Sequence, residues 1–183
     1  MRVITGAARG KKLKTPDGMH TRPTAERVKE ALFSAIQFHL PNSRFLDLFA
    51  GSGQMGIEAL SRGASKAVFI DNDKKAYMLI QDNIKTTGFE KNACVILSDY
   101  MSFLNRCSEK FDIIFLDPPY AEDFLENSLK RITEIDILTD CGIIVCERPA
   151  DKLQELEIPG LIRAKDYRYG KTWITVYRKG LPE

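Results

Sequence analysis

The sequence predicts an α/β protein with a mostly parallel, doubly wound sheet, and three observations support this. Apolar, strand-like runs alternate with helical patterns from about residue 45 to residue 146. A glycine-rich loop joins the first of these strands to a helix, as is common where an open parallel sheet binds a ligand. The alternation then ends, because 161–169 and 172–178 read as two strands joined by a short turn. We therefore expect an antiparallel hairpin at the edge of the sheet.

The individual elements follow from local patterns. Residues 2–14 predict a small β-hairpin, and Pro16 to Gly18 predict a turn. Thr24 is expected to cap a helix that runs to about Leu40. The strands expected next are 45–49, 67–70, 93–97, 111–116 and 142–146, and the helices expected between them are 54–61, 74–87 and 124–133.

Composition is that of an ordinary globular domain. The chain has 183 residues, of which 44% are hydrophobic and 28% are charged, enough to bury a substantial core. It has neither an apolar stretch of membrane-spanning length nor a signal-peptide pattern, so a cytoplasmic protein without membrane contact is expected. The four cysteines and two histidines lack metal-like spacing, so we expect reduced thiols and no metal. A monomer is the default expectation.

The net charge of +2 is unevenly distributed along the chain. Residues 1–30 carry eight Lys and Arg residues against three Asp and Glu residues. Such a local excess attracts polyanions, although a solvated basic hairpin would have the same composition. We divide the chain into a basic N-terminal arm, 1–22, and a main domain, 23–183.

An Asp-Pro-Pro-Tyr motif at 117–120 follows the apolar run 111–116. The Asp117 carboxylate can accept one N–H, and the carbonyl of Pro118 can accept another. With Pro119 rigidifying the turn and the ring of Tyr120 stacking on a plane, the motif suits a flat group that carries an exocyclic NH2. The same residues could instead be loop punctuation after a strand.

Residues 47–56 place a G-x-G-x-x-G pattern between a strand and a helix. The glycines let the backbone approach a ligand closely, but dinucleotide-binding enzymes use the same spacing. Four acids follow four successive strands and would meet at one edge of the sheet: Asp47, Asp71, Asp99 and Asp117. That acidic crevice suits a ligand with an ammonium and a cationic sulfur, such as S-adenosylmethionine, better than an anionic dinucleotide. Each acid alone could be a helix cap or a solvated loop end.

Together these motifs resemble those of the class I, S-adenosylmethionine-dependent amino methyltransferases. Further blocks are similar to the bacterial RsmD family, namely residues 2–6, 9–10, 22–24, 27–33 and 56–64. That family methylates N2 of one specific guanine in the 16S rRNA of the small ribosomal subunit. The resemblance covers nearly the whole chain and implies a Rossmann-like fold with a seven-stranded sheet. The family often has glutamate where this chain has Asp71, and the shorter acid can still bind ribose hydroxyls.

The resemblance also implies roles for particular residues. Asp117, Pro118, Pro119 and Tyr120 would hold the guanine amine. The cofactor would contact Asp47, Phe49, Gly51, Ser52, Gly53, Asp71, Asn72, Asp99 and Tyr100, with Asp71 at the ribose and Asp99 at the adenine amine. RNA would dock on Arg2, Arg9, Lys11, Lys12, Arg22 and Arg27, unless Arg22 instead binds the cofactor carboxylate. Tyr169, Lys171 and Trp173 could line the same face or simply pack an edge strand.

Three other functions stay open at this point. A DNA adenine-N6 or cytosine-N4 methyltransferase would use the same Asp-Pro-Pro-Tyr motif, although 183 residues leave little room for a target-recognition region. An NAD-dependent oxidoreductase would need a substrate domain and a downstream catalytic acid or base. A non-catalytic RNA-binding module could retain the fold. The substrate could be naked rRNA or an assembling subunit.

Overall fold

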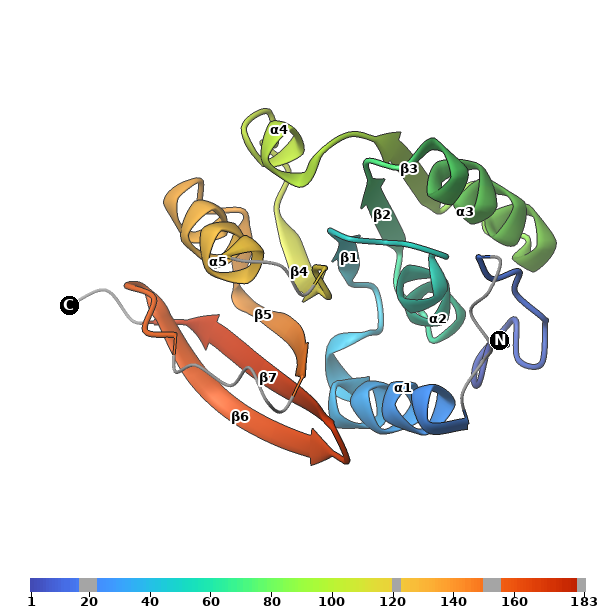
Figure 1. The fold of residues 1–183 in the computed structure, drawn as a ribbon, viewed down its shortest axis with the longest axis horizontal. Helices are drawn as coiled ribbons and strands as arrows, with labels where there is room; N and C mark the ends of the chain where they lie inside the picture. The colour runs from blue at the N-terminus through green and yellow to red at the C-terminus, as the bar shows by residue number, and fades with distance from the viewer. Residues whose placement is uncertain (17–22, 120–122, 150–155, 181–183) are drawn as a thin grey trace.

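The computed structural model describes residues 1–16, 23–119, 123–149 and 156–180, and it is built around one seven-stranded sheet (Figure 1). The strand order is β3-β2-β1-β4-β5-β7-β6. The strands are β1 (Arg44–Asp47), β2 (Lys66–Asp71), β3 (Ala93–Leu97), β4 (Phe111–Leu116), β5 (Leu138–Pro149), β6 (Leu161–Tyr169) and β7 (Thr172–Lys179). β1 to β5 pair in parallel, and β7 runs antiparallel to both β5 and β6. The predicted sheet and its C-terminal hairpin are therefore confirmed.

Helices cover both faces of the sheet, as a doubly wound fold requires (Figure 1). The helices are α1 (Pro23–Ala35), α2 (Gln54–Ser61), α3 (Lys74–Thr87), α4 (Tyr100–Leu104) and α5 (Phe124–Glu134), with a 3₁₀ turn at Gln37–His39. Apolar residues of α1, α2 and α3 form one core layer, and those of α4 and α5 form the other. In β4, Phe115 points to the first layer and Leu116 to the second, so this strand is buried on both sides.

The first helix differs from the prediction at both ends. Its first residue is Pro23, so Thr24 lies inside the helix rather than at its N-cap. Proline is favoured at the first helical position because the N–H that it lacks would have no partner there. The helix ends at Ala35 instead of Leu40, and the 3₁₀ turn that follows keeps both Ile36 and Leu40 buried.

Two other elements were not predicted correctly. β5 extends over Leu138–Pro149 rather than 142–146, because β7 pairs with it as far as Pro149. The short helix α4 was missed, and Asp99 caps it by accepting a hydrogen bond from the Ser102 N–H at 2.9 Å. Among the described residues, no helix is long and apolar enough to cross a membrane.

The predicted N-terminal β-hairpin is reduced to a single antiparallel bridge between Arg2 and Lys12. Instead of projecting as an arm, residues 1–14 pack against the main domain, with Val3, Ala8 and Leu13 buried. Gly6, at φ +89°, presses on the carbonyl of Ser61, whose oxygen would lie 1.7 Å from an added Cβ. This contact leaves no room for a side chain at Gly6.

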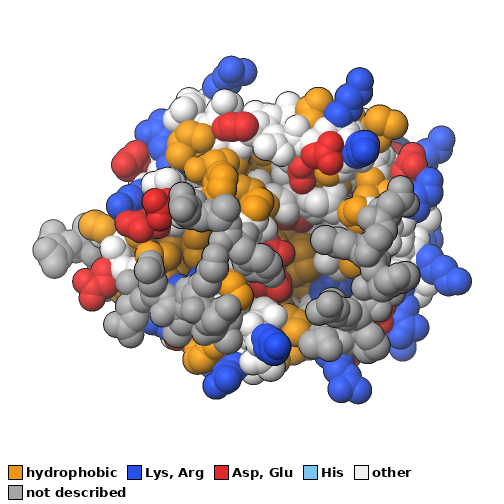
Figure 2. Space-filling model, viewed as in Figure 1, with side chains coloured by type: hydrophobic (Ala, Val, Ile, Leu, Met, Phe, Trp, Pro, Cys, Tyr) orange, Lys and Arg blue, Asp and Glu red, His pale blue; other side chains and the backbone are white. Residues whose placement is uncertain are grey.

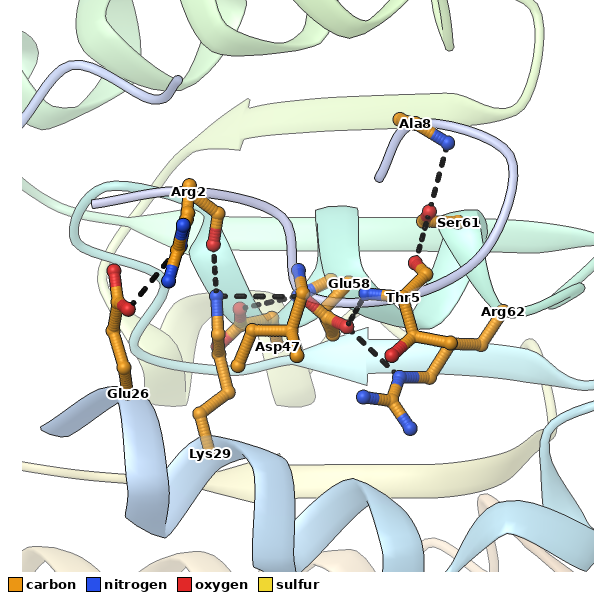
Figure 3. A network of polar contacts seen from close by, with 11 residues as sticks. Arg2, Thr5, Ala8, Glu26, Lys29, Asp47, Glu58, Ser61 and Arg62 are labelled. Atoms are coloured by element: carbon orange, nitrogen blue, oxygen red, sulfur yellow. Dashed lines mark hydrogen bonds and ion pairs between the residues drawn. The ribbon is translucent and has the colours of Figure 1, made fainter. Parts of the chain in front are cut away.

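Glu58 of α2 anchors the N-terminal segment (Figure 3). Its fully buried carboxylate accepts hydrogen bonds from the N–H groups of Ile4 and Thr5, at 2.8 and 3.0 Å. It also forms ion pairs with Lys29 of α1 at 3.4 Å and Arg62 at 2.8 Å. The segment is therefore joined to two helices by buried polar contacts.

Candidate functional site

A pocket of about 410 Å³ lies at the carboxyl ends of the parallel strands. This is where open α/β sheets bind ligands. It is lined by Leu48, Phe49, Gly51, Asp71, Asn72, Ser98, Tyr100, Asp117, Pro118, Pro119 and Phe124. In Figure 2, acidic and hydrophobic side chains meet in the hollowed middle of the visible face, while lysine and arginine side chains stand mainly around its rim. The pocket thus joins the two predicted motifs, the glycine loop and the Asp-Pro-Pro segment.

The glycine loop forms one wall of the pocket at Gly51. The backbone there has φ +55°, and an added Cβ would meet no atom within 4 Å, so the space beside it is open to a ligand. The Gly51 N–H donates to the Asp71 carboxylate at 2.8 Å. Ser52 and Gly53 shape the loop from behind instead of lining the pocket, since Gly53 packs against Ile80 of α3.

Asp47 lies beneath the loop and does not line the pocket. It is 1% exposed, and its Oδ2 accepts a hydrogen bond from the Gly56 N–H at 3.2 Å. Its Oδ1 has no hydrogen-bond partner among the described residues. Burial raises the pKa of Asp47 to about 7, and the charges of Asp117 and Asp71 raise it further. A buried carboxylate in this state suits a ligand that brings positive charge.

Asp71 is held in place by its own loop. Its Oδ2 accepts the Gly51 N–H, and its Oδ1 accepts the Asp73 N–H at 2.9 Å. Each oxygen has a second lone pair, so the fixed carboxylate can still accept ribose hydroxyl groups. Asn72 lines the pocket beside it.

The predicted acid on the third strand has a different job. Asp99 caps α4 and does not line the pocket, whereas its neighbours Ser98 and Tyr100 do. Tyr100 belongs to an aromatic group with Phe49 and Phe124, with ring centroids 5.2 to 6.3 Å apart. Together these rings give the pocket an apolar wall suited to a flat heterocycle.

Three lining residues were not among the predicted site residues: Leu48, Ser98 and Phe124. Ser98 follows β3 directly, so its place at the sheet edge gave a usable signal. Leu48 reads as part of an apolar strand. Phe124 opens α5, and its contact with Phe49 and Tyr100 joins segments far apart in the chain.

Asp117 follows β4 and lines the pocket with Pro118 and Pro119. Burial of its carboxyl group raises its pKa to about 6. Tyr120 lies outside the described residues. The sequence did predict that the acid and the prolines would lie beside the glycine loop.

Glu147 is a second carboxyl group beside Asp117 that the sequence analysis missed. Leu116 pairs with Cys146, so Asp117 and Glu147 are level on neighbouring strands. Burial, followed by the charge of Asp117, raises the pKa of Glu147 to about 8. An acid that ends the apolar run 142–146 was the available signal, because the other parallel strands also end in acids.

Several of the predicted RNA-binding residues make contacts within the protein. Arg2 forms an ion pair with Glu26 at 3.4 Å, and Lys11 Nζ donates to two carbonyl groups at the end of α3. Arg9, Lys12 and Arg27 are exposed, and Arg22 lies outside the described residues. Residues 6–9 contact Ser61 at the C-terminal end of α2, near the sheet edge opposite the pocket.

Comparison with known proteins gives consistent matches over most of the chain. The family described as Conserved hypothetical protein 95 matches residues 1–178. YlbH of Bacillus subtilis (strain 168) is 40% identical over 186 residues, covering 98% of this chain and 99% of that protein. Ribosomal RNA small subunit methyltransferase D of Escherichia coli (strain K12) is 37% identical over 147 residues, covering 80% and 74% of the two chains. The solved structure of yhhF from Escherichia coli superposes with a TM-score of 0.87 at 31% identity, covering 98% and 97%.

Proposed function

Because this chain belongs to the family described as Conserved hypothetical protein 95, the RsmD family, we propose that it methylates ribosomal RNA. The methyl donor is S-adenosylmethionine. The acceptor in this proposal is the exocyclic N2 amine of one guanine in the 16S rRNA of the small subunit. The relative from Escherichia coli is named for methylation of small-subunit rRNA, which supports the choice of substrate.

The observation that carries the proposal is the meeting of two motifs in one pocket. Gly51 and Asp71, from the donor-binding motif, line the same cavity as Asp117, Pro118 and Pro119. A donor bound at the first group and an amine held at the second would be brought together in one enclosed space. Such positioning supplies much of the acceleration in a transfer between two bound molecules.

The donor would bind along the glycine loop. Bound S-adenosylmethionine supplies a methyl group on a positively charged sulfur, which makes that methyl group open to attack. Asp71 would accept hydrogen bonds from the ribose hydroxyls, and the open space at Gly51 leaves room for the chain that joins ribose to methionine. The unpartnered Oδ1 of Asp47 suits the positive charge of the donor from below the loop. The rings of Phe49, Tyr100 and Phe124 would pack against adenine.

The acceptor amine would be held by the Asp117 carboxylate and the carbonyl of Pro118. A guanine amine is a weak nucleophile because its lone pair is delocalised into the ring. Two hydrogen bonds from its N–H groups would favour a more localised lone pair and aim it at the methyl group. As the nitrogen gains positive charge, the negative charge of Asp117 would stabilise it. We propose that Tyr120 stacks on the extruded base.

Replacement of Asp117 by asparagine tests this function, because asparagine keeps the shape but not the charge. Methyl transfer to unmethylated 30S subunits and to naked 16S rRNA is measured with labelled S-adenosylmethionine, and the nucleoside products are identified by mass spectrometry. We expect N2-methylguanosine from the unsubstituted protein and at least a hundredfold slower transfer by D117N, with donor affinity unchanged in calorimetry. The proposed function fails if the unsubstituted protein makes methyladenine or methylcytosine, or if D117N turns over normally.

RNA docking on the basic N-terminal segment is also a proposal. Its exposed cations Arg9, Lys12 and Arg27 are those free of the internal contacts that hold Arg2 and Lys11. If they neutralise phosphates, their replacement by alanine weakens RNA binding and flattens its salt dependence.

A further inference from the structure

The β6–β7 hairpin brings aromatic and basic side chains to the sheet edge where the pocket opens. Pro149, the last residue of β5, pairs with Thr172 of β7, and Thr172 pairs with Tyr169 of β6. Because β5 runs parallel to β4 and ends at the same edge, the turn at 170–171 lies at the carboxyl edge of the sheet. Figure 1 shows this hairpin and the N-terminal segment on opposite sides of the sheet.

Two tyrosine rings of the hairpin lie level with the catalytic acid. Tyr167 pairs with Ile174, which pairs with Glu147, the residue level with Asp117. Three strand spacings separate β4 from β6, or about 14 Å. The rings of Tyr167 and Tyr169 stack, with centroids 6.4 Å apart and planes 8° apart. They are half-buried against the core layer of α1, α2 and α3, so part of each ring remains accessible.

Three cations accompany these rings. Lys165 Nζ lies 5.0 Å from the centre of the Tyr167 ring, and the Arg168 guanidinium lies 5.9 Å from that of Trp173. Lys171 is exposed in the turn. Within the described ranges, none of these three cations forms an ion pair, whereas the nearby acid Asp166 is paired with Arg163 at 2.7 Å. The hairpin tip therefore carries positive charge that nothing in the described protein neutralises.

We propose that the hairpin tip, defined as Lys165, Tyr167, Arg168, Tyr169, Lys171 and Trp173, docks the single-stranded RNA that flanks the methylated nucleotide. This inference rests on the proposed function. Proteins that bind single strands combine cations that follow the phosphates with aromatic rings on which bases stack, and the hairpin tip offers both. Its position at the pocket edge places it beside the nucleotides next to a base held at Asp117. Charges on an edge strand can also serve only to prevent aggregation, and the experiment separates the two roles.

A charge test compares two double variants. Arg168→Ala with Lys171→Ala removes one arginine and one lysine from the hairpin tip. Arg106→Ala with Lys91→Ala removes the same pair of residue types from exposed connections that lead into β4 and β3 at the opposite sheet edge. The equilibrium dissociation constant of an unmethylated 16S rRNA fragment is measured over a range of salt concentrations, together with kcat and KM for methyl transfer.

We expect the hairpin variant to bind RNA about tenfold more weakly, with the slope of log K against log salt reduced by about 1.4, or 0.7 for each phosphate contact. KM should rise while kcat stays within about twofold, and the control variant should match the unsubstituted protein. Equal RNA affinity and equal salt slopes for the two variants would overturn the proposal.

A second pair of variants separates stacking from packing at Tyr169. Tyr169→Phe keeps the ring, and Tyr169→Leu keeps apolar volume against the core without an aromatic face. We expect the leucine variant alone to lose RNA affinity, by about fivefold or more, at unchanged thermal stability. Equal binding by the two variants would refute stacking on this ring. An unsubstituted protein that binds the fragment but methylates no RNA would refute the proposed function, and the binding comparison would still decide the role of the hairpin.

Discussion

Three buried carboxyl groups meet near the pocket, and their environments give them different charges. Burial raises the pKa of Asp47 to about 7, of Asp117 to about 6 and of Glu147 to about 8. The charge of Asp117 acts on both of the others, so ionising one makes ionisation of the next harder. Near neutral pH, Asp117 therefore carries the charge and Glu147 stays largely protonated. That arrangement supplies one negative charge where the acceptor amine is proposed to bind.

The raised pKa of Asp117 predicts how the rate of methyl transfer depends on pH. Only the ionised carboxylate can accept an N–H and stabilise positive charge, and this form is present above pH 6 and lost below it. We expect kcat/KM to fall about tenfold per pH unit below pH 6 and to level off above it. Initial rates between pH 4.5 and 7.5, with circular dichroism to verify folding, provide the measurement. A rate that stays constant down to pH 4.5 would contradict the assigned role.

At the level of elements, α2 serves two structures at once. Its N-terminus receives the glycine loop, and Asp47 accepts the Gly56 N–H in its first turn. Its middle presents Glu58 to the N-terminal segment and to Lys29 of α1 (Figure 3). Burial lowers the pKa of Lys29, and the Glu58 charge opposes that shift. A lysine in such a site depends on its partner.

Glu58→Gln should therefore destabilise the protein strongly. Glutamine fills the same space but leaves Lys29 buried without a counter-charge, a change that costs about 3–5 kcal/mol. Urea unfolding at pH 7 gives the free energy. The control is Glu109→Gln, since Glu109 forms ion pairs with Arg44 and Lys66 that are partly exposed and should contribute less than about 1 kcal/mol. Equal losses for the two variants would show that burial of the pair has no special weight.

On the scale of the whole molecule, α3 connects the N-terminal segment to the glycine loop. Asn83 is fully buried, and its Nδ2 donates to the carbonyls of Lys14 and Ser52, at 3.0 and 2.9 Å. Its Oδ1 accepts the Lys14 N–H at 2.8 Å. One side chain thus satisfies backbone groups of two segments distant in sequence, and the loop position depends on both.

Asn83→Ala should lower both stability and donor affinity. Each backbone group left buried without a partner costs about 1–3 kcal/mol, and the loss of the Ser52 contact loosens the loop beside Gly51. Thermal unfolding and calorimetric titration with S-adenosylmethionine measure the two effects. Asn92→Ala is the matched control, because Asn92 makes a single exposed hydrogen bond to Ser65. Donor affinity equal to that of the control would mean that the loop holds its shape without Asn83.

The sequence by itself determined the fold and the two walls of the pocket. Period-two apolar runs, helical patterns and the glycine spacing are local features, and the parallel order they imply brings the ends of β1, β2 and β4 to one edge. For this reason Gly51, Asp71 and Asp117 could be placed together before any contact was known.

Only the tertiary structure decided which residues at that edge face the pocket and which serve other purposes. Asp99 caps a helix, Asp47 lies beneath the loop, and the N-terminal segment is packed through Glu58 and Asn83 instead of standing free. Glu147 reaches Asp117, and the hairpin tip reaches the pocket edge, through strand register. These outcomes depend on contacts between residues far apart in the chain, and local patterns do not encode such contacts because each depends on how all the elements pack together.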